Sequence, residues 1–279
     1  MLSIAKFLHQ KLFSLDGAQF VRAFEAINRL RWHIPIHLEY SLADRCYVVN
    51  DFSIGGTTPS KMFFSRKERI WIYAKGVQNR LEKLGEVYSL KYCNLKPQDV
   101  VIDCGANIGE FSALVRSCYG STVIAVEPET DEARCIPFNV PGVHHVINAA
   151  LWHEETELKF FSKNRSADSS IFETEDYDEV ITVPTMRLDD LFDRYGLDQI
   201  KLFKLEAEGA EPEILLGATR ALPHIEFISA DLGPERGLAQ ESTVIPVCNY
   251  LFKFGFELVS LYHKRQVYLF RNSQLKTKV

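Results

Sequence analysis

Residues 100–111 constrain the fold of this 279-residue chain more than any other stretch. They open with a β-branched run, 100–102, which is typical of a parallel strand buried on both faces. Gly105 and Gly109 then mark a tight turn, where a side chain would strain the backbone or block a ligand. A helical apolar pattern starts at Ile108. The stretch therefore predicts a strand, a turn and a helix whose first N–H groups point above the strand end.

An acidic residue follows at the position that a nucleoside-binding site requires. Residues 122–126 read as the next strand, and Glu127 stands at its end. Glu127 lies about 20 residues beyond the glycine turn, the usual offset for a carboxylate that accepts hydrogen bonds from ribose hydroxyls. We therefore predict that Glu127 binds the ribose of a nucleoside-containing ligand.

The spacing of the glycines discriminates between such ligands. A dinucleotide fingerprint G-x-G-x-x-G that began at Gly105 would need glycines where Asn107 and Glu110 stand. A pyrophosphate needs that close backbone approach, whereas S-adenosylmethionine (SAM) has no phosphate. The pattern D-x-G-x-N-x-G from Asp103 to Gly109 fits SAM better, and Asp103 could meet the cationic amino end of methionine, directly or through water. A plain strand–turn–helix and a nicotinamide dehydrogenase are the alternatives.

Composition excludes other classes of protein. The formal net charge of −5 argues against a dominant nucleic-acid face. No run approaches the roughly 18 apolar residues of a membrane span. The six cysteines form no C-x-x-C pair, which favours reduced thiols in a cytoplasmic protein. The eight histidines show no H-x-x-x-H or H-E-x-x-H spacing, so the sequence signals no zinc site.

Residues 1–35 carry a basic amphipathic pattern with helical spacing, for example at Phe20, Phe24 and Ile27. Such a helix packs on the domain or on a second copy of the chain, in a homo-oligomer, or it lies on a membrane surface. The pattern is irregular from there to residue 59, with a strand indicated at 46–49. We expect residues 1–85 to form a helical N-terminal extension and cap over the ligand cleft.

From residue 100 onward strand and helix patterns alternate, which is typical of a doubly wound α/β sheet. Two later strands, 200–205 and 225–230, are each followed by a carboxylate, Glu206 and Asp231. Because ligands of open α/β sheets bind at the carboxyl ends of the strands, we expect both carboxylates to lie near the glycine turn.

Four motifs, in chain order, resemble those of the FkbM-type SAM-dependent methyltransferases. They are the D-x-G-A-N-x-G turn at 103–109, V-E-P at 126–128, N-A-A-L at 148–151, and K-L-E-A-E-G-A-E at 204–211. The resemblance covers about residues 75–272, with one departure, because the family has Asp where this chain has Glu206. It implies a class I methyltransferase (Rossmann-like) sheet of seven strands, the last antiparallel, with residues 86–279 as the methyltransferase domain.

The resemblance also implies roles for individual residues. Its members often transfer methyl to a hydroxyl of a sugar or secondary metabolite. By position, the methionine and ribose side would be lined by Asp103, Gly105, Asn107 and Gly109. Glu127 would hold the ribose, and Asn148 with Ala149 would border the adenine.

Methyl transfer to oxygen requires an aligned acceptor and a group that removes the hydroxyl proton. The candidates at the strand ends are Glu206, Glu208 and Asp231. Glu208 could instead serve as favourable charge at a helix N-terminus, as we favour for Glu211 and Glu213. Several carboxylates near one cleft could also hold a divalent cation, although no spacing signals it. A catalytically inactive SAM-binding or partner-binding module is the alternative function.

Overall fold

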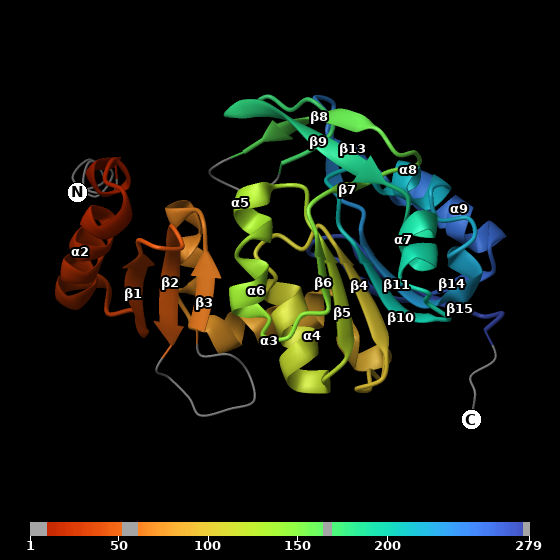
Figure 1. Cartoon of the computed structure of the whole chain (residues 1–279), viewed down its shortest axis with the longest axis horizontal. Coiled ribbons are helices and arrows are strands. Elements are labelled where there is room, and N and C mark those ends of the chain that lie inside the picture. Colours follow the sequence, from red (N-terminus) through yellow and green to blue (C-terminus); the bar gives the residue numbers. More distant parts are fainter. Residues whose placement is uncertain (1–9, 52–60, 164–168, 276–279) are drawn as a thin grey trace.

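The computed structural model describes residues 10–51, 61–163 and 169–275. Its centre is a seven-stranded sheet, visible edge-on in Figure 1, with strand order β14-β15-β11-β10-β4-β5-β6. In that order the strands are Phe256–Tyr262, Val267–Asn272, Ile225–Asp231, Ile200–Leu205, Val100–Cys104, Thr122–Val126 and His145–Ile147. Only β15 runs antiparallel to its neighbours β11 and β14 within this sheet. This is the class I methyltransferase arrangement, so the predicted fold is confirmed.

Both faces of the sheet are buried, as the β-branched strands predict. Val101 and Val123 join a core on one face, with α3 (Val77–Val87) and α4 (Glu110–Tyr119). Ile102 and Ile124 join a core on the other face, with α7 (Leu188–Arg194), α8 (Glu211–Leu216) and α9 (Val244–Lys253). Neighbouring residues of one strand enter different cores because successive side chains point to opposite faces.

The N-terminal region is less helical than predicted. The helix α2 (Gly17–Ile27) and the π-helical turn η1 (Asn28–Trp32) are present, but β1 (Ile36–Ser41), β2 (Cys46–Asp51) and β3 (Lys61–Phe64) form an antiparallel sheet. The strand predicted at 46–49 is therefore confirmed, and the helical description of residues 1–85 is wrong there. Aromatic cross-strand packing, with the Tyr47 and Phe64 rings stacked at 5.6 Å between centroids, favours strands over a helix.

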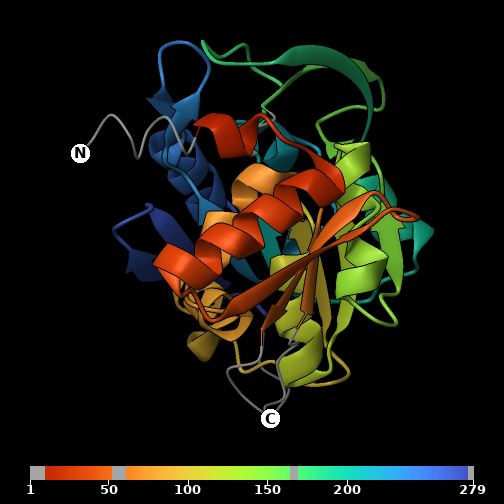
Figure 2. The ribbon, with the colours of Figure 1, turned by 90° about the vertical axis from the view of Figure 1, so that its left-hand side faces the viewer.

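Helix α2 lies across this small sheet (Figure 2) and packs on protein. Phe20 and Phe24 are fully buried, and they belong to the same core as Tyr73, Leu81 and Leu114. The N-terminal region thus has no separate core from the central sheet. The first nine residues, which carry part of the basic pattern, lie outside the described residues. No helix that the structure describes is both long and apolar enough to cross a bilayer.

Several of the remaining elements gather at the carboxyl end of the sheet. There α5 (Thr130–Ala133) and α6 (Ile136–Asn139) follow β5. β7 (Ala150–Leu151), β8 (Glu157–Ser162) and β9 (Glu179–Met186) form a three-stranded sheet, and β12 (Pro234–Arg236) pairs with β13 (Glu241–Ser242). Figure 1 shows β8 and β9 passing over the end of the central sheet where α5 starts. The turns η2 (Lys67–Tyr73), η3 (Leu90–Tyr92) and η4 (Leu222–His224) complete the fold.

Candidate functional site

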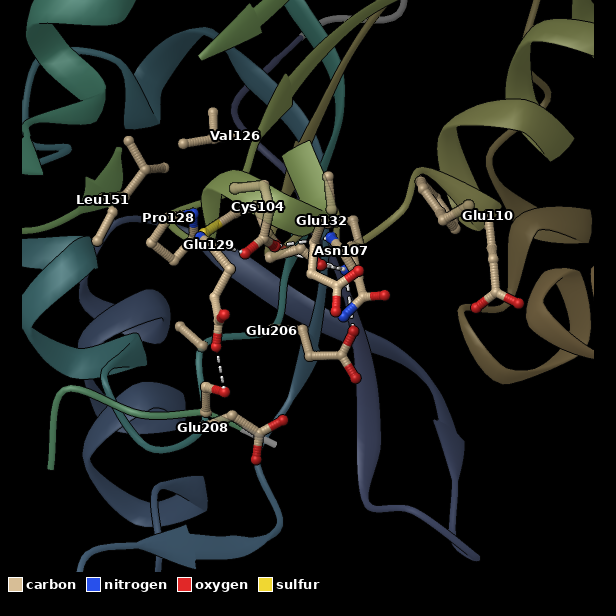
Figure 3. Close-up of a pocket in the computed structure, with 18 of the residues that line it drawn as sticks. Cys104, Asn107, Glu110, Val126, Pro128, Glu129, Glu132, Leu151, Glu206 and Glu208 are labelled. Carbon is tan, nitrogen blue, oxygen red and sulfur yellow. Dashed lines mark hydrogen bonds and ion pairs between the residues drawn. The ribbon is translucent and has the colours of Figure 1, made fainter. Parts of the chain in front are cut away.

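A cavity of about 260 Å³ lies at the carboxyl ends of β4, β5 and β10 (Figure 3). One wall is the glycine turn with the residues that follow β5, and another is the segment 149–151. The N-terminal region closes it with Arg66, Arg69 and Arg80. The cavity is thus built by chain segments that lie far apart in the sequence.

The glycine turn lines the cavity, and its backbone N–H groups bond to neighbouring protein groups. Gly105 has φ +70°, and a Cβ there would lie 2.1 Å from the Glu206 carbonyl oxygen, so only glycine fits. The N–H groups of Gly105 and Ala106 both donate to the Val126 carbonyl at 3.0 Å. Asn107 is also left-handed, with φ +51°, a conformation that Asn tolerates better than most residues. The turn is therefore locked against β5 and β10.

Glu127 lies in the cavity with each carboxylate oxygen held by one backbone N–H. The donors are the N–H groups of Asn107, at 2.7 Å, and Glu129, at 2.8 Å. Burial raises the pKa of Glu127 to about 8, while the two hydrogen bonds act in the opposite direction. In the ionised form each oxygen has two lone pairs, so both oxygens retain one for a further donor, such as a pair of ribose hydroxyls.

Next to Glu127 the cavity wall is apolar. Its members include Val126, Ala149, Leu151, Phe160 and Ile171. Ala149 lies here as predicted by position, but the side chain of Asn148 does not line the cavity. Its amide donates to the carbonyls of Glu127 and Pro128, each at 2.9 Å, and thus holds the chain after β5 in place.

A cluster of charged side chains occupies the opposite side, at the ends of β4, β10 and β11. We call it the strand-end cluster, and it consists of Tyr88, Asp103, Lys204, Glu206, Asp231 and Arg265. Glu206 contacts Lys204 Nζ at 2.9 Å, Arg265 Nη2 at 2.8 Å and the Tyr88 hydroxyl at 2.6 Å. Lys204 also pairs with Asp103 at 3.1 Å, and Arg265 pairs with Asp231 at 2.8 Å.

The charges of the strand-end cluster set the pKa values of its carboxylates. Burial acts to raise the pKa of Glu206, but Lys204 and Arg265 outweigh it and hold the pKa well below its usual value. Glu206 is therefore ionised and a weak base. Burial and the charge of Glu206 raise the pKa of Asp231 to about 6, against the opposing effect of Arg265.

Two residues of the predicted turn do not reach the cavity. Asp103 is fully buried and accepts a hydrogen bond from the Ser112 hydroxyl at 2.6 Å, in addition to its ion pair with Lys204. This arrangement opposes a direct contact between Asp103 and the amino group of methionine. Asp103 does not line the cavity, and Lys204 already neutralises its negative charge. Gly109 instead allows close packing, since a Cβ there would lie 3.2 Å from Ile136 and Val140.

Glu206 and Glu208 both line the cavity, and Asp231 does not. Glu208 has φ +48° and projects from the loop after β10 (Figure 3). Glu211 accepts from the N–H groups of Ala207, at 2.9 Å, and Gly209, at 3.2 Å, and so holds this loop. Glu213 pairs with Arg236 at 2.7 Å. Glu211 and Glu213 both lie in the first turn of α8, as expected, but their contacts are with this loop and with Arg236.

A family model described as a methyltransferase FkbM domain matches residues 103–258, which is more than half of the chain. The chain belongs to the FkbM methyltransferase family. The matched region of this FkbM methyltransferase contains the glycine turn, Glu127 and the loop after β10, and it ends within β14.

This FkbM methyltransferase is similar to the 2-O-methyltransferase NoeI of Sinorhizobium fredii (strain NBRC 101917 / NGR234). The two are 21% identical over 194 residues, which are 63% of this chain and 80% of NoeI. Among solved structures, the N-terminal domain of human METTL16 is 11% identical, with a TM-score of 0.41 over 71% of this chain and 70% of that one. An rRNA methylase from Streptococcus thermophilus is 13% identical, with a TM-score of 0.40 over 68% of this chain and 97% of that one.

SAM is the methyl donor of this FkbM methyltransferase, and the cavity has the chemistry to bind it. Glu127 offers acceptors for ribose hydroxyls, and the apolar wall beside it suits a flat base. In the strand-end cluster three carboxylates face two cations, so the side that contains Glu206 carries excess negative charge. That charge complements the sulfonium of SAM. Within the described residues no group of His, Cys, Asp and Glu side chains is arranged to hold a metal ion.

Sequence reasoning missed a second charged group, which we call the cap cluster. Glu110, the first residue of α4, contacts Arg69 at 3.1 Å, Arg80 at 2.9 Å and the Tyr73 hydroxyl at 2.7 Å. Burial acts to raise the pKa of Glu110, but the charges of Arg80 and Arg69 outweigh the effect of burial and lower this pKa to about 2. The partners lie 30 to 41 residues away in the sequence, so no local pattern signals them.

Proposed function

We propose that this FkbM methyltransferase transfers the methyl group of SAM to a hydroxyl of a sugar or a similar secondary metabolite. The observation that carries the donor side is the charge of the strand-end cluster beside the Glu127 pocket. The sulfonium of SAM would lie against the strand-end cluster, and its nucleoside would lie in the Glu127 pocket. The acceptor class is supported by the likeness to NoeI, whose name describes methyl transfer to oxygen.

Each cavity residue has a part in this proposal. Glu127 would hold the ribose, with Asn107 fixing the orientation of its carboxylate. Ala149 would border the adenine, while Asn148 would act from behind by holding the chain after β5. Glu206 would offset the positive charge of the donor. Bound SAM would supply an electrophilic methyl group, and the chain's own task would be to align the acceptor hydroxyl and receive its proton.

The N-terminal residues would serve as a cap over the domain at 86–279. Arg66, Arg69 and Ile72 line the cavity from this region. A cap excludes water from a methyl donor that water would otherwise consume. We propose a small molecule or glycan as the acceptor, not a nucleic acid, because the formal net charge of −5 opposes binding to phosphate backbones.

The test combines calorimetry with labelled methyl transfer. We expect the full chain to bind SAM and its demethylated product, but not NAD. Glu127→Ala should weaken SAM binding by about 1–3 kcal/mol through lost hydrogen bonds. The matched control Glu257→Ala, on the exposed side of β14, should bind SAM normally. Unchanged SAM affinity in Glu127→Ala would contradict the donor assignment.

The acceptor is tested with methyl-labelled SAM and extracts rich in glycans and small metabolites. We expect label in a methyl ether that survives mild base, which esters do not. Tight SAM binding without any labelled product would indicate an inactive SAM-binding module instead.

A further inference from the structure

A second cavity, of about 320 Å³, adjoins the one described above. Glu208 lines both cavities. The walls of the second come from the segment between β8 and β9 and from the β12–β13 region, with Lys163, Thr174, Glu175, Glu235 and Gln240 among them. Both walls belong to the layer that passes over the carboxyl end of the sheet in Figure 1. A molecule in the second cavity would therefore lie beside whatever fills the first.

The second cavity contains a buried hydroxyl that has no partner. Thr174 is only 9% exposed, and among the described residues nothing hydrogen-bonds its Oγ1. A buried hydroxyl without a hydrogen bond costs about 1–3 kcal/mol. Because Thr174 lines the cavity, rotation about its χ1 angle would turn the hydroxyl toward a polar ligand there. This orphan hydroxyl points to a ligand that can donate and accept hydrogen bonds.

Glu235 differs from the carboxylates around it. Glu206 and Asp231 share Arg265, and Glu211 is held by backbone N–H groups and the Thr243 hydroxyl. The carboxyl of Glu235 has no hydrogen-bond or ion-pair partner in the part of the chain that the structure describes. Its carboxyl group lies next to Gly233, since a Cβ added there would be 3.5 Å from Glu235 Oε1 and 3.5 Å from Asp231 Oδ1. Glu235 therefore lies between the second cavity, which it lines, and Asp231 of the strand-end cluster.

The charges around Glu235 favour its protonated form. Burial raises its pKa to about 8, and the carboxylates of Asp231, Glu206 and Glu211 act in the same direction, against Arg265. Glu208, Glu175 and Asp176 also line the second cavity, with Lys163 as the cation of the lining. A carboxyl group with a pKa near the working pH can accept a proton in one step and release it to water in the next.

We propose that the second cavity binds the methyl acceptor, a neutral hydroxyl-rich molecule, and that Glu235 receives the proton of the reacting hydroxyl. Thr174 hydrogen-bonds another hydroxyl of the acceptor and orients it. Four carboxyl groups against one ammonium in the lining repel a phosphorylated or otherwise anionic acceptor. This inference rests on the proposed function, because it supplies the acceptor site for that reaction.

The step balances without any further reactant. The acceptor oxygen forms a bond to the donor methyl carbon as the sulfur–methyl bond breaks, and the electron pair of that bond stays on sulfur. The hydroxyl proton passes to Glu235 Oε, and water then removes it. Glu206 stays ionised throughout, because Lys204 and Arg265 stabilise its charge.

Acceptor binding is tested first, without turnover. A panel of neutral methyl glycosides is screened by saturation-transfer NMR against the full chain saturated with S-adenosylhomocysteine. We expect the wild type to bind some of them, and Thr174→Val to bind the same ones roughly 3- to 10-fold more weakly. Thr174→Val should also be as stable as the wild type or more so, since the hydroxyl has no protein partner. The failure of every glycoside to bind the wild type would overturn the inference, as would unchanged binding in Thr174→Val.

Turnover of the glycosides that bind tests Glu235. In the wild type kcat/KM should rise with pH through about 8, because the ionised form of Glu235 is the base. Glu235→Gln should lower kcat roughly 10²–10⁴-fold and abolish that rise, with SAM affinity retained. The control Glu241→Gln removes an exposed charge from the same β12–β13 region and should match the wild type. Wild-type methylation with an unchanged rate and pH profile in Glu235→Gln would overturn the role of Glu235 while leaving the proposed function intact. No methylation of any acceptor by the wild type would contradict the proposed function itself.

Discussion

The cap cluster and the strand-end cluster are built from the same parts but differ in charge balance. In each, a glutamate is held by two cations and one tyrosine hydroxyl, and in each the pKa of that glutamate is lowered. Around Glu110 the two cations exceed the single carboxylate, and its side chain is 5% exposed. Around Glu206 three carboxylates exceed two cations, and its side chain is 20% exposed toward the cavity.

The difference shows that a glutamate held by two cations and a tyrosine can either stabilise the fold or bind a cationic ligand, depending on the net charge around it. Arg69 and Arg80 come from the N-terminal region and Glu110 from the central domain, so their ion pairs join the two. In Figure 3 Glu110 stands apart from Glu206, on the helix α4. The strand-end cluster has unbalanced negative charge at an open surface, which a cationic ligand can neutralise. Arg69, Arg80 and Glu110 also line the cavity, but their net positive charge does not complement a sulfonium. The cap cluster should therefore mainly control stability, and the strand-end cluster donor affinity.

The largest effect is expected at the turn that supports the strand-end cluster. In Gly105→Ala the new Cβ would collide with the Glu206 carbonyl oxygen at 2.1 Å, in a left-handed backbone conformation. We expect a loss of at least about 4 kcal/mol in the free energy of unfolding, measured in denaturant. Gly196→Ala is the control, since Gly196 also has positive φ but nothing within 4 Å of an added Cβ. It should lose only about 1–2 kcal/mol. Equal losses would show that backbone conformation, and not the contact with Glu206, makes glycine necessary.

Next in size is Glu110→Gln in the cap cluster. It leaves two buried guanidinium groups without a carboxylate, so we expect a loss of about 3–5 kcal/mol in the free energy of unfolding at pH 7. Because the pKa of Glu110 falls from 4.5 to about 2 on folding, its stabilisation is complete above pH 4.5. It is lost as the pH falls toward 2. The stability difference from the wild type should therefore be constant between pH 7 and 5 and shrink below pH 4.5. A difference that grows on acidification would contradict this account.

Glu206→Gln should lower SAM affinity more than it lowers stability. Lys204 retains Asp103 and Arg265 retains Asp231, so the loss of stability should be smaller than in Glu110→Gln. Calorimetry should show SAM affinity lower by roughly 10- to 100-fold, the worth of a charge-assisted contact of about 1.5–3 kcal/mol. If Glu206→Gln were the less stable variant and bound SAM normally, the comparison between the two clusters would fail.

The smallest effects are expected when the hydroxyl of Tyr73 or Tyr88 is removed. Tyr73→Phe and Tyr88→Phe each remove one hydrogen bond to an ionised glutamate, worth about 1.5 kcal/mol. Thermal unfolding should show a similar loss in both variants. Only Tyr88→Phe should also weaken SAM binding, because Tyr88 orients Glu206 in the cavity. Equal SAM affinities in the two variants would remove the distinction that we draw.

Local pattern was sufficient for the central sheet and for part of the site. The β-branched strands 100–102 and 122–126 predicted burial on both faces, which the two cores confirm. Gly105 and Glu127 were found from spacing alone, because a strand–turn–helix fixes where the next strand ends. The three-stranded N-terminal sheet was not predicted, since its pairing depends on contacts between aromatic side chains across strands.

The sequence by itself determined the sheet and the family, because these depend on short local patterns and motifs. Only the tertiary structure decided what the carboxylates do. Glu206 is ionised mainly through Lys204, two residues away, and further through Arg265, 59 residues away, and Tyr88, 118 residues away. Asp103 is withdrawn from the cavity by its ion pair with Lys204. Among the residues that the structure describes, the carboxyl of Glu235 has no partner, although Glu206, Asp231 and Glu211 each have one. The proton affinity of a carboxyl group depends on burial and on charges within a few ångströms, and for these residues the chain supplies those charges from distant segments.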